Sequence, residues 1–411
     1  MNQPLSSFAA RLREIFFVGD NLRGLCSSTA DGANNEPSHV GSCGKNFESL
    51  ALDLFALQFE HNLAYRKICK SRKFTPESVE LWAQIPAVPT SAFKEMELTS
   101  LAPGERTTVF HSSGTTEQKP SRHFHNSESL AVYEASLWSW FAENVVAGSP
   151  STGSARESSD WKLADAVLGV PSAQPARVML LTPPPAQVPH SSLVHMFEIV
   201  RQKMRAAESG YCGKLAEDGA WTLDFEAVVE VLSAPGDEAS PPPLLLLGTA
   251  FSFVHLMDHL TENHLQFQLP EGSRVMETGG YKNRSRTMPK AELHELITQR
   301  LGIPAESIVC EYGMSELSSQ AYDAEIHPPV SIRHPRAFRF PPWARVQIIS
   351  PETGCEVAEG ETGLIRVFDL VNVYSVAAVQ TEDLGIRRGD GFELVGRAQH
   401  SEPRGCSLMT A

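Results

Sequence analysis

The chain has 411 residues, of which 35 are basic and 49 acidic, so its formal net charge at pH 7 is −14. Hydrophobic residues make up 42% and charged residues 20%, which provides for a sizeable core and excludes a chain that is disordered throughout. The acidic balance argues against a general nucleic-acid-binding protein, because such a protein needs a basic field to meet phosphates. We therefore expect no nucleic-acid partner.

Seven cysteines are spread widely along the chain without a CxxC pair. This odd number and spacing indicate neither a disulfide framework nor a zinc site, and reduced thiols are the simplest interpretation. The N-terminal segment carries Arg11 and Arg13 where a signal peptide needs an apolar run. The most apolar stretch, residues 244–257, is too short and too interrupted to span a bilayer. We expect a soluble, cytoplasmic protein with no membrane span.

In chain order, residues 21–45 are rich in Ser, Gly, Asn and Cys and predict a loop. Apolar residues recur at roughly helical spacing over residues 47–68, which predicts one long amphipathic helix. Residues 143–176 include the run GSPSTGSARESS and predict a mobile insertion.

The middle of the chain alternates short apolar runs with helical patterns. We expect a strand at each of the runs 178–182, 244–247, 274–278 and 308–312. Pro289 begins a helical pattern and Gly302 ends it, an arrangement that helix termini favour. This β-α-β-α order predicts an α/β fold with a parallel sheet covered by helices.

After about residue 325 the pattern changes to short strands, expected at 345–349, 363–368 and 392–395, with turns between them. Such spacing predicts a β-rich subdomain packed on the α/β part. We therefore divide the chain into an α/β part over 1–325, a β-rich subdomain over 326–400 and a flexible tail over 401–411.

A hydroxyl- and glycine-rich loop follows an expected strand at 107–110, and it consists of Ser112, Ser113, Gly114, Thr115 and Thr116. Backbone N–H groups and hydroxyls in such a loop can face phosphate oxygens, and Lys119 and Arg122 can add charge-assisted contacts. The pattern is not the GxxxxGK[ST] loop of the common NTPases, so a Ser/Thr-rich turn is an equal alternative.

Two further motifs carry polar groups suited to a nucleotide. The run from Glu311 to Glu316 (EYGMSE) follows an expected strand, and open α/β sheets bind ligands beyond the carboxyl ends of their strands. Tyr312 can stack on a planar base, and Glu316 can hold Mg²⁺ through a carboxylate oxygen. Asp383 can accept ribose hydroxyls and Arg397 can reach ribose or phosphate oxygens. A solvated Glu and a hairpin turn are the plain alternatives.

The order of these motifs resembles the adenylate-forming superfamily, and within it the LuxE-type acyl-protein synthetases. The resemblance covers most of the chain. It runs through IPAVP at 85–89 with Phe93-Lys94, the SSGTT loop with Pro120-Ser121-Arg122, TGGYK at 278–282, YGMSEL at 312–317 and RGCSL at 404–408.

The resemblance implies ATP- and Mg²⁺-dependent activation of a carboxylate, with the loop from Ser112 to Thr116 on the β- and γ-phosphates. The other implied roles are as follows: Gly279 and Gly280 line the adenine and acyl pocket, Tyr312 and Gly313 lie at adenine, Ser315 meets the α-phosphate, Glu316 the metal, and Asp383 and Arg397 the ribose. Lys119 and His111 are catalytic candidates, since both adjoin the phosphate loop and His111 can orient the acyl carboxylate.

Two features depart from the superfamily pattern. Glu117 stands where the loop usually has Gly, and a carboxylate beside a triphosphate is unfavourable unless it points away or meets a metal. The sequence also ends 14 residues after Arg397, which leaves no room for the small C-terminal ligase domain and its catalytic lysine. We therefore expect that domain to be absent, and CoA ligation by domain rotation not to occur.

Cys406 lies five residues from the end, within Arg404-Gly405-Cys406. A thiolate can attack an acyl adenylate and keep the acyl group as a thioester. Arg404 can lower the thiol pKa, and Gly405 can let the tail swing. In the resembled family, a cysteine near the C-terminus is the acyl acceptor. The alternative is a frayed tail whose cysteine has no role.

The resemblance, together with Cys406, thus implies an acid–thiol ligase that converts a long-chain fatty acid to acyl-AMP and transfers the acyl group to Cys406. An acyl reductase or acyl-carrier protein is the partner that the resemblance implies. A stand-alone ligase that releases acyl-AMP or makes acyl-CoA is one alternative. A non-catalytic acyl- or nucleotide-binding subunit of a reductase complex is another. His255 and His259 lie four residues apart without an evident third zinc ligand, so we expect them to pack or line a pocket.

Overall fold

The fold is described from a computed structural model of the chain. It covers residues 3–17, 47–112, 119–146, 177–206, 209–217, 219–233, 242–279, 288–323 and 336–398. The expected loop at 21–45 and the tail that carries Cys406 therefore lie outside the described residues.

The elements are as follows. The helices are α1 (Gln3–Phe17), α3 (Phe47–His61), α4 (Leu63–Ser71), α5 (Ala92–Glu95), α6 (Ser127–Phe141), the π-helical turn η4 (Ala142–Val146), α7 (Ser192–Met204), α8 (Phe225–Ser233), α9 (Ala250–Glu262) and α10 (Lys290–Leu301). The strands are β1 (Val88–Pro89), β2 (Thr108–His111), β3 (Arg122–His125), β4 (Arg177–Leu180), β5 (Ser209–Tyr211), β6 (Gly213–Leu215), β7 (Trp221–Leu223), β8 (Leu244–Thr249), β9 (Arg274–Thr278), β10 (Ile308–Tyr312), β11 (Ala321–Tyr322), β12 (Ala344–Ile349), β13 (Thr362–Asp369), β14 (Ala378–Arg388) and β15 (Gly391–Arg397).

The larger sheet has six strands in the order β11-β10-β9-β8-β4-β5. All neighbours are parallel except β11, which runs antiparallel to β10. Every residue of β4, β8, β9 and β10 is buried, as expected of parallel strands with both faces covered. The predicted strands at 178–182, 244–247, 274–278 and 308–312 are thus confirmed as the centre of this sheet.

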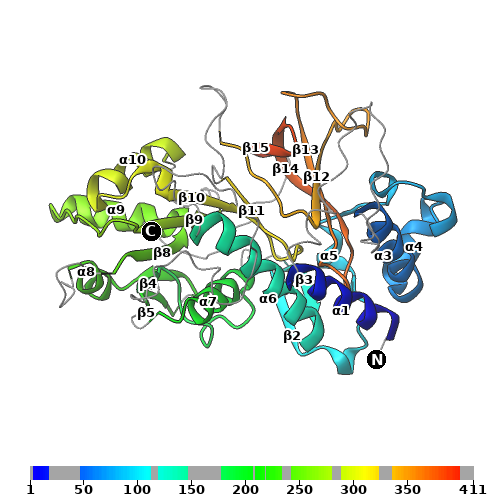
Figure 1. Ribbon diagram of the computed structural model, residues 1–411, viewed down its shortest axis with the longest axis horizontal. Coiled ribbons are helices and arrows are strands. Elements are labelled where there is room, and N and C mark those ends of the chain that lie inside the picture. The colour runs from blue at the N-terminus through cyan, green and yellow to red at the C-terminus, as the bar shows by residue number, and fades with distance from the viewer. Residues whose placement is uncertain are drawn as a thin grey trace, which may run out of the picture.

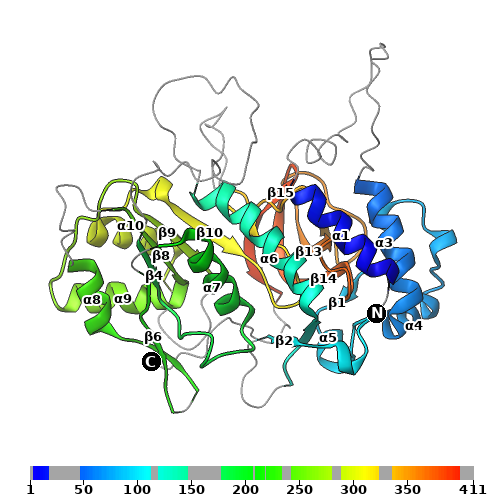
Figure 2. The same cartoon turned by 60° about the horizontal axis from the view of Figure 1, so that its bottom comes forward.

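Alternate residues along these strands pack into two different hydrophobic clusters. On β8, Leu245 and Leu247 join the cluster that includes α6 and α7, whereas Leu244 and Leu246 join the one that includes α9 and α10. Figure 1 shows α9 and α10 beside β8–β10, and Figure 2 shows α7 on the other side of the same strands. The sheet is therefore covered by helices on both faces, as the chain order of its elements predicts.

The second sheet has the order β1-β14-β13-β12, and β15 pairs with the C-terminal half of β14. Its strands are antiparallel except β1, which lies parallel to β14 through Val88–Val379 and Pro89–Gln380. The expected β-rich region near the C-terminus is confirmed, but its edge strand comes from residues 88–89. The helices α3 and α4 lie beside this sheet (Figure 1).

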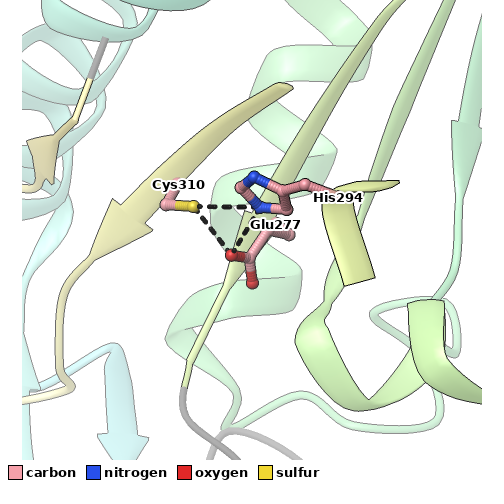
Figure 3. A group of neighbouring side chains, drawn as sticks. All are labelled: Glu277, His294 and Cys310. Carbon is pink, nitrogen blue, oxygen red and sulfur yellow. Dashed lines mark hydrogen bonds and ion pairs between the residues drawn. The ribbon is translucent and has the colours of Figure 1, made fainter. Parts of the chain in front are cut away.

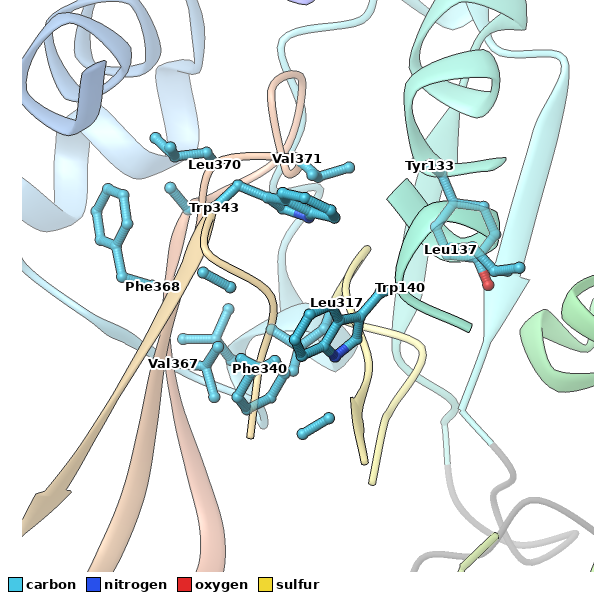
Figure 4. Packing of buried hydrophobic residues seen from close by; sticks show 14 of the residues in the cluster. Tyr133, Leu137, Trp140, Leu317, Phe340, Trp343, Val367, Phe368, Leu370 and Val371 are labelled. Atoms are coloured by element: carbon cyan, nitrogen blue, oxygen red, sulfur yellow. The ribbon is translucent and has the colours of Figure 1, made fainter. Parts of the chain in front are cut away.

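Helix α6 and the second sheet share a core rich in aromatic residues (Figure 4). The rings of Trp140 and Trp343 meet edge to face at 6.5 Å, and the indole N–H of Trp343 donates to the buried hydroxyl of Ser136 at 2.7 Å. The indole N–H and the serine hydroxyl thereby have a hydrogen-bond partner within the protein, as buried polar groups require. This core joins the two sheets through α6.

The predicted single helix over residues 47–68 is wrong, because the structure has two helices with Asn62 between them. Asn62 takes an extended backbone, its side-chain oxygen accepts a hydrogen bond from the N–H of Tyr65, and its side-chain N–H donates to the carbonyl of Ser375. Asn is among the best N-cap residues, so it begins α4. The apolar spacing is compatible with both arrangements and therefore did not reveal the break.

The prediction of a mobile insertion over 143–176 is wrong for its first four residues. Residues 143–146 are helical, Val145 is fully buried, and the Asn144 side chain donates to the carbonyl of Trp140. The remainder, 147–176, lies outside the described residues. No helix that the structure describes combines the length and apolarity needed to cross a bilayer.

Candidate functional site

Three residues predicted to bind nucleotide are joined in one hydrogen-bonded network. Tyr312 ends β10, Asp383 lies in the middle of β14, and Arg397 ends β15 directly opposite Asp383 in the strand register. The Tyr312 hydroxyl donates to Asp383 Oδ2 at 2.9 Å, and Arg397 Nε donates to Asp383 Oδ1 at 3.2 Å. The network therefore links the carboxyl end of the larger sheet to the second sheet.

The ring of Tyr312 is almost completely buried. It lies against Phe338, Phe340 and Phe392, with ring centroids 5.1–6.3 Å apart. Burial, with the nearby Asp383 carboxylate, raises the pKa of Tyr312 well above its usual value, so the hydroxyl stays a donor. Two donors from the residues that the structure describes contact Asp383. An ionised carboxylate offers about four lone-pair sites, so it retains capacity for further donors.

Ser315 and Glu316 form a turn just beyond β10. The Ser315 hydroxyl donates to Glu316 Oε2 at 3.0 Å, and the Asn372 side chain donates to the Glu316 backbone carbonyl. Glu316 is completely buried, so the plain alternative of a solvated Glu is wrong. Buried carboxylates need partners, and the hydroxyl of Ser315 is one of them.

His123 contacts this turn and was not singled out by the sequence. It lies on β3, fully buried, with Nδ1 2.8 Å from the backbone carbonyl oxygen of Ser315. Burial lowers the pKa of His123 to about 4, so the ring is neutral at pH 7 and Nδ1–H donates. In the sequence, the alternation His123-Phe124-His125 predicts a short strand, but it does not indicate that His123 contacts Ser315.

The hydroxyl-rich loop is closed at its base by the β2–β3 hairpin. His111 pairs with Arg122 in the strand register, Ser112 N–H donates to the carbonyl of Ser121, and Ser121 N–H donates to the hydroxyl of Ser112 at 2.9 Å. The predicted phosphate-binding residues Ser113, Gly114, Thr115 and Thr116, with Glu117, lie outside the described residues. Their roles stay predictions.

The two catalytic candidates beside this loop differ in their surroundings. The His111 ring stacks on His190 with centroids 4.6 Å apart, and burial with the nearby His190 lowers the pKa of His111. Lys119 is exposed and lies 3.7 Å from a carboxylate oxygen of Glu95, a contact that solvent weakens. Its ammonium can therefore exchange Glu95 for another anion at small cost.

Two of the predicted glycines, Gly279 and Gly313, directly follow the neighbouring strands β9 and β10. Gly279 follows β9 with φ +83°, in the left-handed region, and Gly280 lies outside the described residues. A Cβ added to Gly313 would lie 2.2 Å from Oε1 of Glu311. Any other residue at this position would therefore clash with the Glu311 carboxyl group. Burial raises the pKa of Glu311 to about 7, and the Thr278 hydroxyl donates to it.

The expectation that His255 and His259 pack against neighbouring residues is confirmed. The His259 ring stacks on Phe225 at 4.0 Å, and His255 meets Phe251 edge to face at 4.3 Å. Cys406 lies outside the described residues, so its role stays a prediction.

Comparison with known proteins identifies the family. The family model of the acyl-protein synthetase LuxE matches residues 42–131 and 167–411. The chain belongs to the LuxE family. The match includes every predicted site residue, and it leaves out 132–166, which overlaps the expected insertion.

Relatives of this LuxE-family chain agree with that assignment. It is 24% identical over 200 residues to the long-chain-fatty-acid–luciferin-component ligase of Aliivibrio fischeri, covering 46% of this chain and 50% of the relative. With the ligase of the same name from Vibrio harveyi it shares 22% over 195 residues, covering 45% and 49%. The chain spans about half the length of these curated relatives in the alignments.

Solved structures support the fold. An open conformation of 2-hydroxyisobutyryl-CoA ligase, in complex with 2-HIB-AMP and CoA, superposes with a TM-score of 0.57 over 87% of this chain and 71% of that one, at 13% identity. The LuxE-family chain thus has the large-domain architecture of adenylate-forming enzymes, with an α/β part and a C-terminal β-rich part, as its motifs predict.

Proposed function

We propose that this protein is an ATP-dependent acid–thiol ligase that activates a long-chain fatty acid and keeps the acyl group on Cys406. In the first step a carboxylate oxygen bonds to the α-phosphorus of ATP, giving acyl-AMP and pyrophosphate. In the second step the Cys406 thiolate attacks the acyl carbon, giving a thioester and AMP. An acyl reductase or acyl-carrier protein would then receive the acyl group.

The observation that carries this proposal is the network of Tyr312, Asp383 and Arg397. It unites two motifs that lie far apart in the chain at the carboxyl end of β10, where open α/β sheets bind ligands. Asp383 has acceptor capacity left for ribose hydroxyls, and Arg397 holds its carboxylate in place. The neutral His123 ring positions Ser315, whose hydroxyl would donate to the α-phosphate as negative charge develops there.

Glu316 offers the kind of oxygen ligand that Mg²⁺ takes, usually one or two carboxylates completed by substrate phosphates and water. In this structure its carboxylate is buried and accepts a hydrogen bond from Ser315, and Glu316 is the residue that would hold the ion. When bound, Mg²⁺ neutralises charge on the phosphates. The neutral His111 and the exposed Lys119 lie at the loop base, where they can orient the acyl carboxylate and the pyrophosphate.

A cytoplasmic location is part of this proposal, since the cysteines of the described residues are unpaired.

Two assays test the steps separately. Fatty-acid-dependent ATP–pyrophosphate exchange reports acyl-AMP formation, and it is expected in the wild type and in Cys406→Ser alike. Labelled fatty acid with ATP is expected to give a hydroxylamine-sensitive acyl-protein in the wild type and in the control Cys355→Ser, whose cysteine is exposed, but not in Cys406→Ser. Equal labelling of Cys406→Ser refutes the acceptor, and exchange with acyl-CoA formation but no labelling identifies a stand-alone ligase. ATP binding without exchange identifies a non-catalytic subunit.

A further inference from the structure

The side chains of Glu277, His294 and Cys310 converge between β9, β10 and α10 (Figure 3). The Cys310 Sγ lies 2.7 Å from Glu277 Oε1 and 3.6 Å from His294 Nε2, and His294 Nε2 lies 3.5 Å from the same carboxylate oxygen. Glu277 and Cys310 are buried, and the His294 side chain is only 13% exposed. Among the described residues, this is the one group of three His, Cys, Asp or Glu side chains close enough to share a metal ion.

The fold explains why these side chains meet. Glu277 on β9 and Cys310 on β10 are partners in the parallel register, so their side chains point to the same face of the sheet. Val275 and Ile308, two residues earlier on the same strands, pack with Leu293 and Ile297 of α10. His294 lies in that stretch of α10, over the sheet face that carries Glu277 and Cys310.

The three donor atoms are the set that Zn²⁺ takes: one thiolate sulfur, one imidazole nitrogen and one carboxylate oxygen. With zinc–ligand distances of about 2.0–2.3 Å and tetrahedral angles, donor atoms lie roughly 3.3–3.6 Å apart. The nitrogen–oxygen and nitrogen–sulfur separations of 3.5 and 3.6 Å already match this geometry. The sulfur–oxygen separation of 2.7 Å is shorter than this range, so these two atoms would move apart when a metal binds.

A second layer of groups supports the cluster. Asp323 is buried, its Oδ1 accepts the backbone N–H of Cys310 at 2.7 Å, and its Oδ2 accepts from Lys290 at 2.7 Å. Lys290 pairs with Asp323 and also faces the Cys310 sulfur, where its charge favours the thiolate. The Glu277 carboxylate and that thiolate would balance the charge of a dication. Outer-shell contacts of this kind orient metal ligands and tune affinity.

We propose that Glu277, His294 and Cys310 bind one Zn²⁺ ion, with water as the fourth ligand. On binding, the Cys310 thiol releases its proton to solvent, and sulfur, Nε2 and one carboxylate oxygen form bonds to the metal. The ion would tie β9, β10 and α10 together, two residues before Gly279 and Tyr312 on the two strands. The inference is independent of the proposed acyl transfer.

The experiment measures metal binding by the full chain, stripped with a chelator and then titrated with Zn²⁺ and, in parallel, with Co²⁺ as a spectroscopic probe. We expect close to one equivalent of Zn²⁺ per chain. Co²⁺ is expected to give a cobalt–thiolate charge-transfer band and the intense visible bands of a four-coordinate ion. Cys310→Ser should abolish the charge-transfer band. His294→Gln should weaken Zn²⁺ binding by more than the roughly 10–100-fold that loss of an outer-shell group causes.

Cys355→Ser and His259→Gln are the matched controls, since Cys355 is exposed in a turn and His259 stacks on Phe225, and both should bind as the wild type does. The wild-type result is decisive by itself if a variant fails to fold by circular dichroism. The proposal is overturned if the stripped wild type binds less than half an equivalent of Zn²⁺ at micromolar concentration. A cobalt spectrum without a thiolate band, or one that persists in Cys310→Ser, overturns it as well.

Discussion

The Nδ1 nitrogen of His123 lies 2.8 Å from the backbone carbonyl oxygen of Ser315, although the two residues are 192 positions apart in the chain. This hydrogen bond ties the base of the hydroxyl-rich loop to the turn that carries Ser315 and Glu316. Both ends are buried, so water does not compete for this hydrogen bond between the two motifs.

Replacing His123 by Phe keeps an aromatic ring beside Phe93 but removes the donor. The Ser315 carbonyl then stays buried without this partner, and we expect a loss of about 1–3 kcal/mol in the free energy of unfolding. Pyrophosphate exchange should fall more in kcat than in the KM for ATP, because Ser315 is misplaced where charge develops. His123→Asn, which retains an N–H donor, should recover part of both. Unchanged exchange kinetics in His123→Phe would show that the bond does not position Ser315.

The pH dependence of stability provides a separate measurement on His123. Its pKa of about 4 in the folded chain lies below the ordinary 6.5, so the unfolded chain binds a proton that the folded chain does not between these values. The free energy of unfolding therefore falls as pH decreases from about 6.5 to 4, by on the order of 3 kcal/mol at about 1.4 kcal/mol per pKa unit. Urea unfolding of wild type and His123→Phe across this range should differ by that slope. Parallel curves for the two proteins would contradict the neutral buried ring.

Glu311 should give the opposite pH dependence. Its pKa is raised to about 7 from the ordinary 4.5, so the folded chain retains a proton that the unfolded chain has lost, and stability falls as pH increases from about 4.5 to 7. Glu311→Gln cannot ionise, and its amide oxygen can still accept from Thr278. We expect the variant to lack this loss, on the order of 3 kcal/mol over the window, and to exceed the wild type in stability at pH 8. If Glu311→Gln were less stable than the wild type at both pH 5 and pH 8, the raised pKa of Glu311 would not control this pH dependence.

Much of the fold could be predicted from local patterns, because the buried parallel strands are continuous apolar runs and the C-terminal strands are separated by turn residues. The pairing of β1 with β14 could not, since Val88 and Val379 carry no signal of their partnership. The same holds for the site. Motif order indicated Tyr312 and Asp383, but their contact arises only when the two sheets meet.

The cluster of Glu277, His294 and Cys310 shows the limit of cysteine spacing as a guide. The absence of a CxxC pair indicated no zinc site, yet parallel register and a helix crossing bring single donors together from three elements. Spacings of 17 and 16 residues match no short motif, because they are set by the length of a β-α-β unit. Such a group is visible only after the sheet is assembled.

A double-mutant cycle tests the link between the two sheets. Tyr312→Phe and Asp383→Asn each remove part of the same hydrogen bond, so their effects on the free energy of unfolding should not add. We expect a coupling energy of about 1.5–3 kcal/mol, the usual value for a hydrogen bond to a charged group. Asp383→Asn should also raise the KM for ATP, because the carboxamide is a weaker acceptor for ribose hydroxyls. Additive effects within about 0.3–0.5 kcal/mol would show that the bond contributes nothing to stability.

Asn62 provides the last prediction, at the helix break that the apolar spacing did not reveal. Its side chain caps α4 through the Tyr65 N–H and also donates to the carbonyl of Ser375 beside β14, so Asn62→Ala removes an N-cap and leaves a buried carbonyl with one donor fewer. The two losses together should lower the free energy of unfolding by about 2–4 kcal/mol. Asn62→Ser keeps a capping oxygen and should retain about half of the lost stability. If α3 and α4 behaved as one continuous helix, Asn62→Ala would instead be neutral or stabilising in urea unfolding, because Ala is the best helix former.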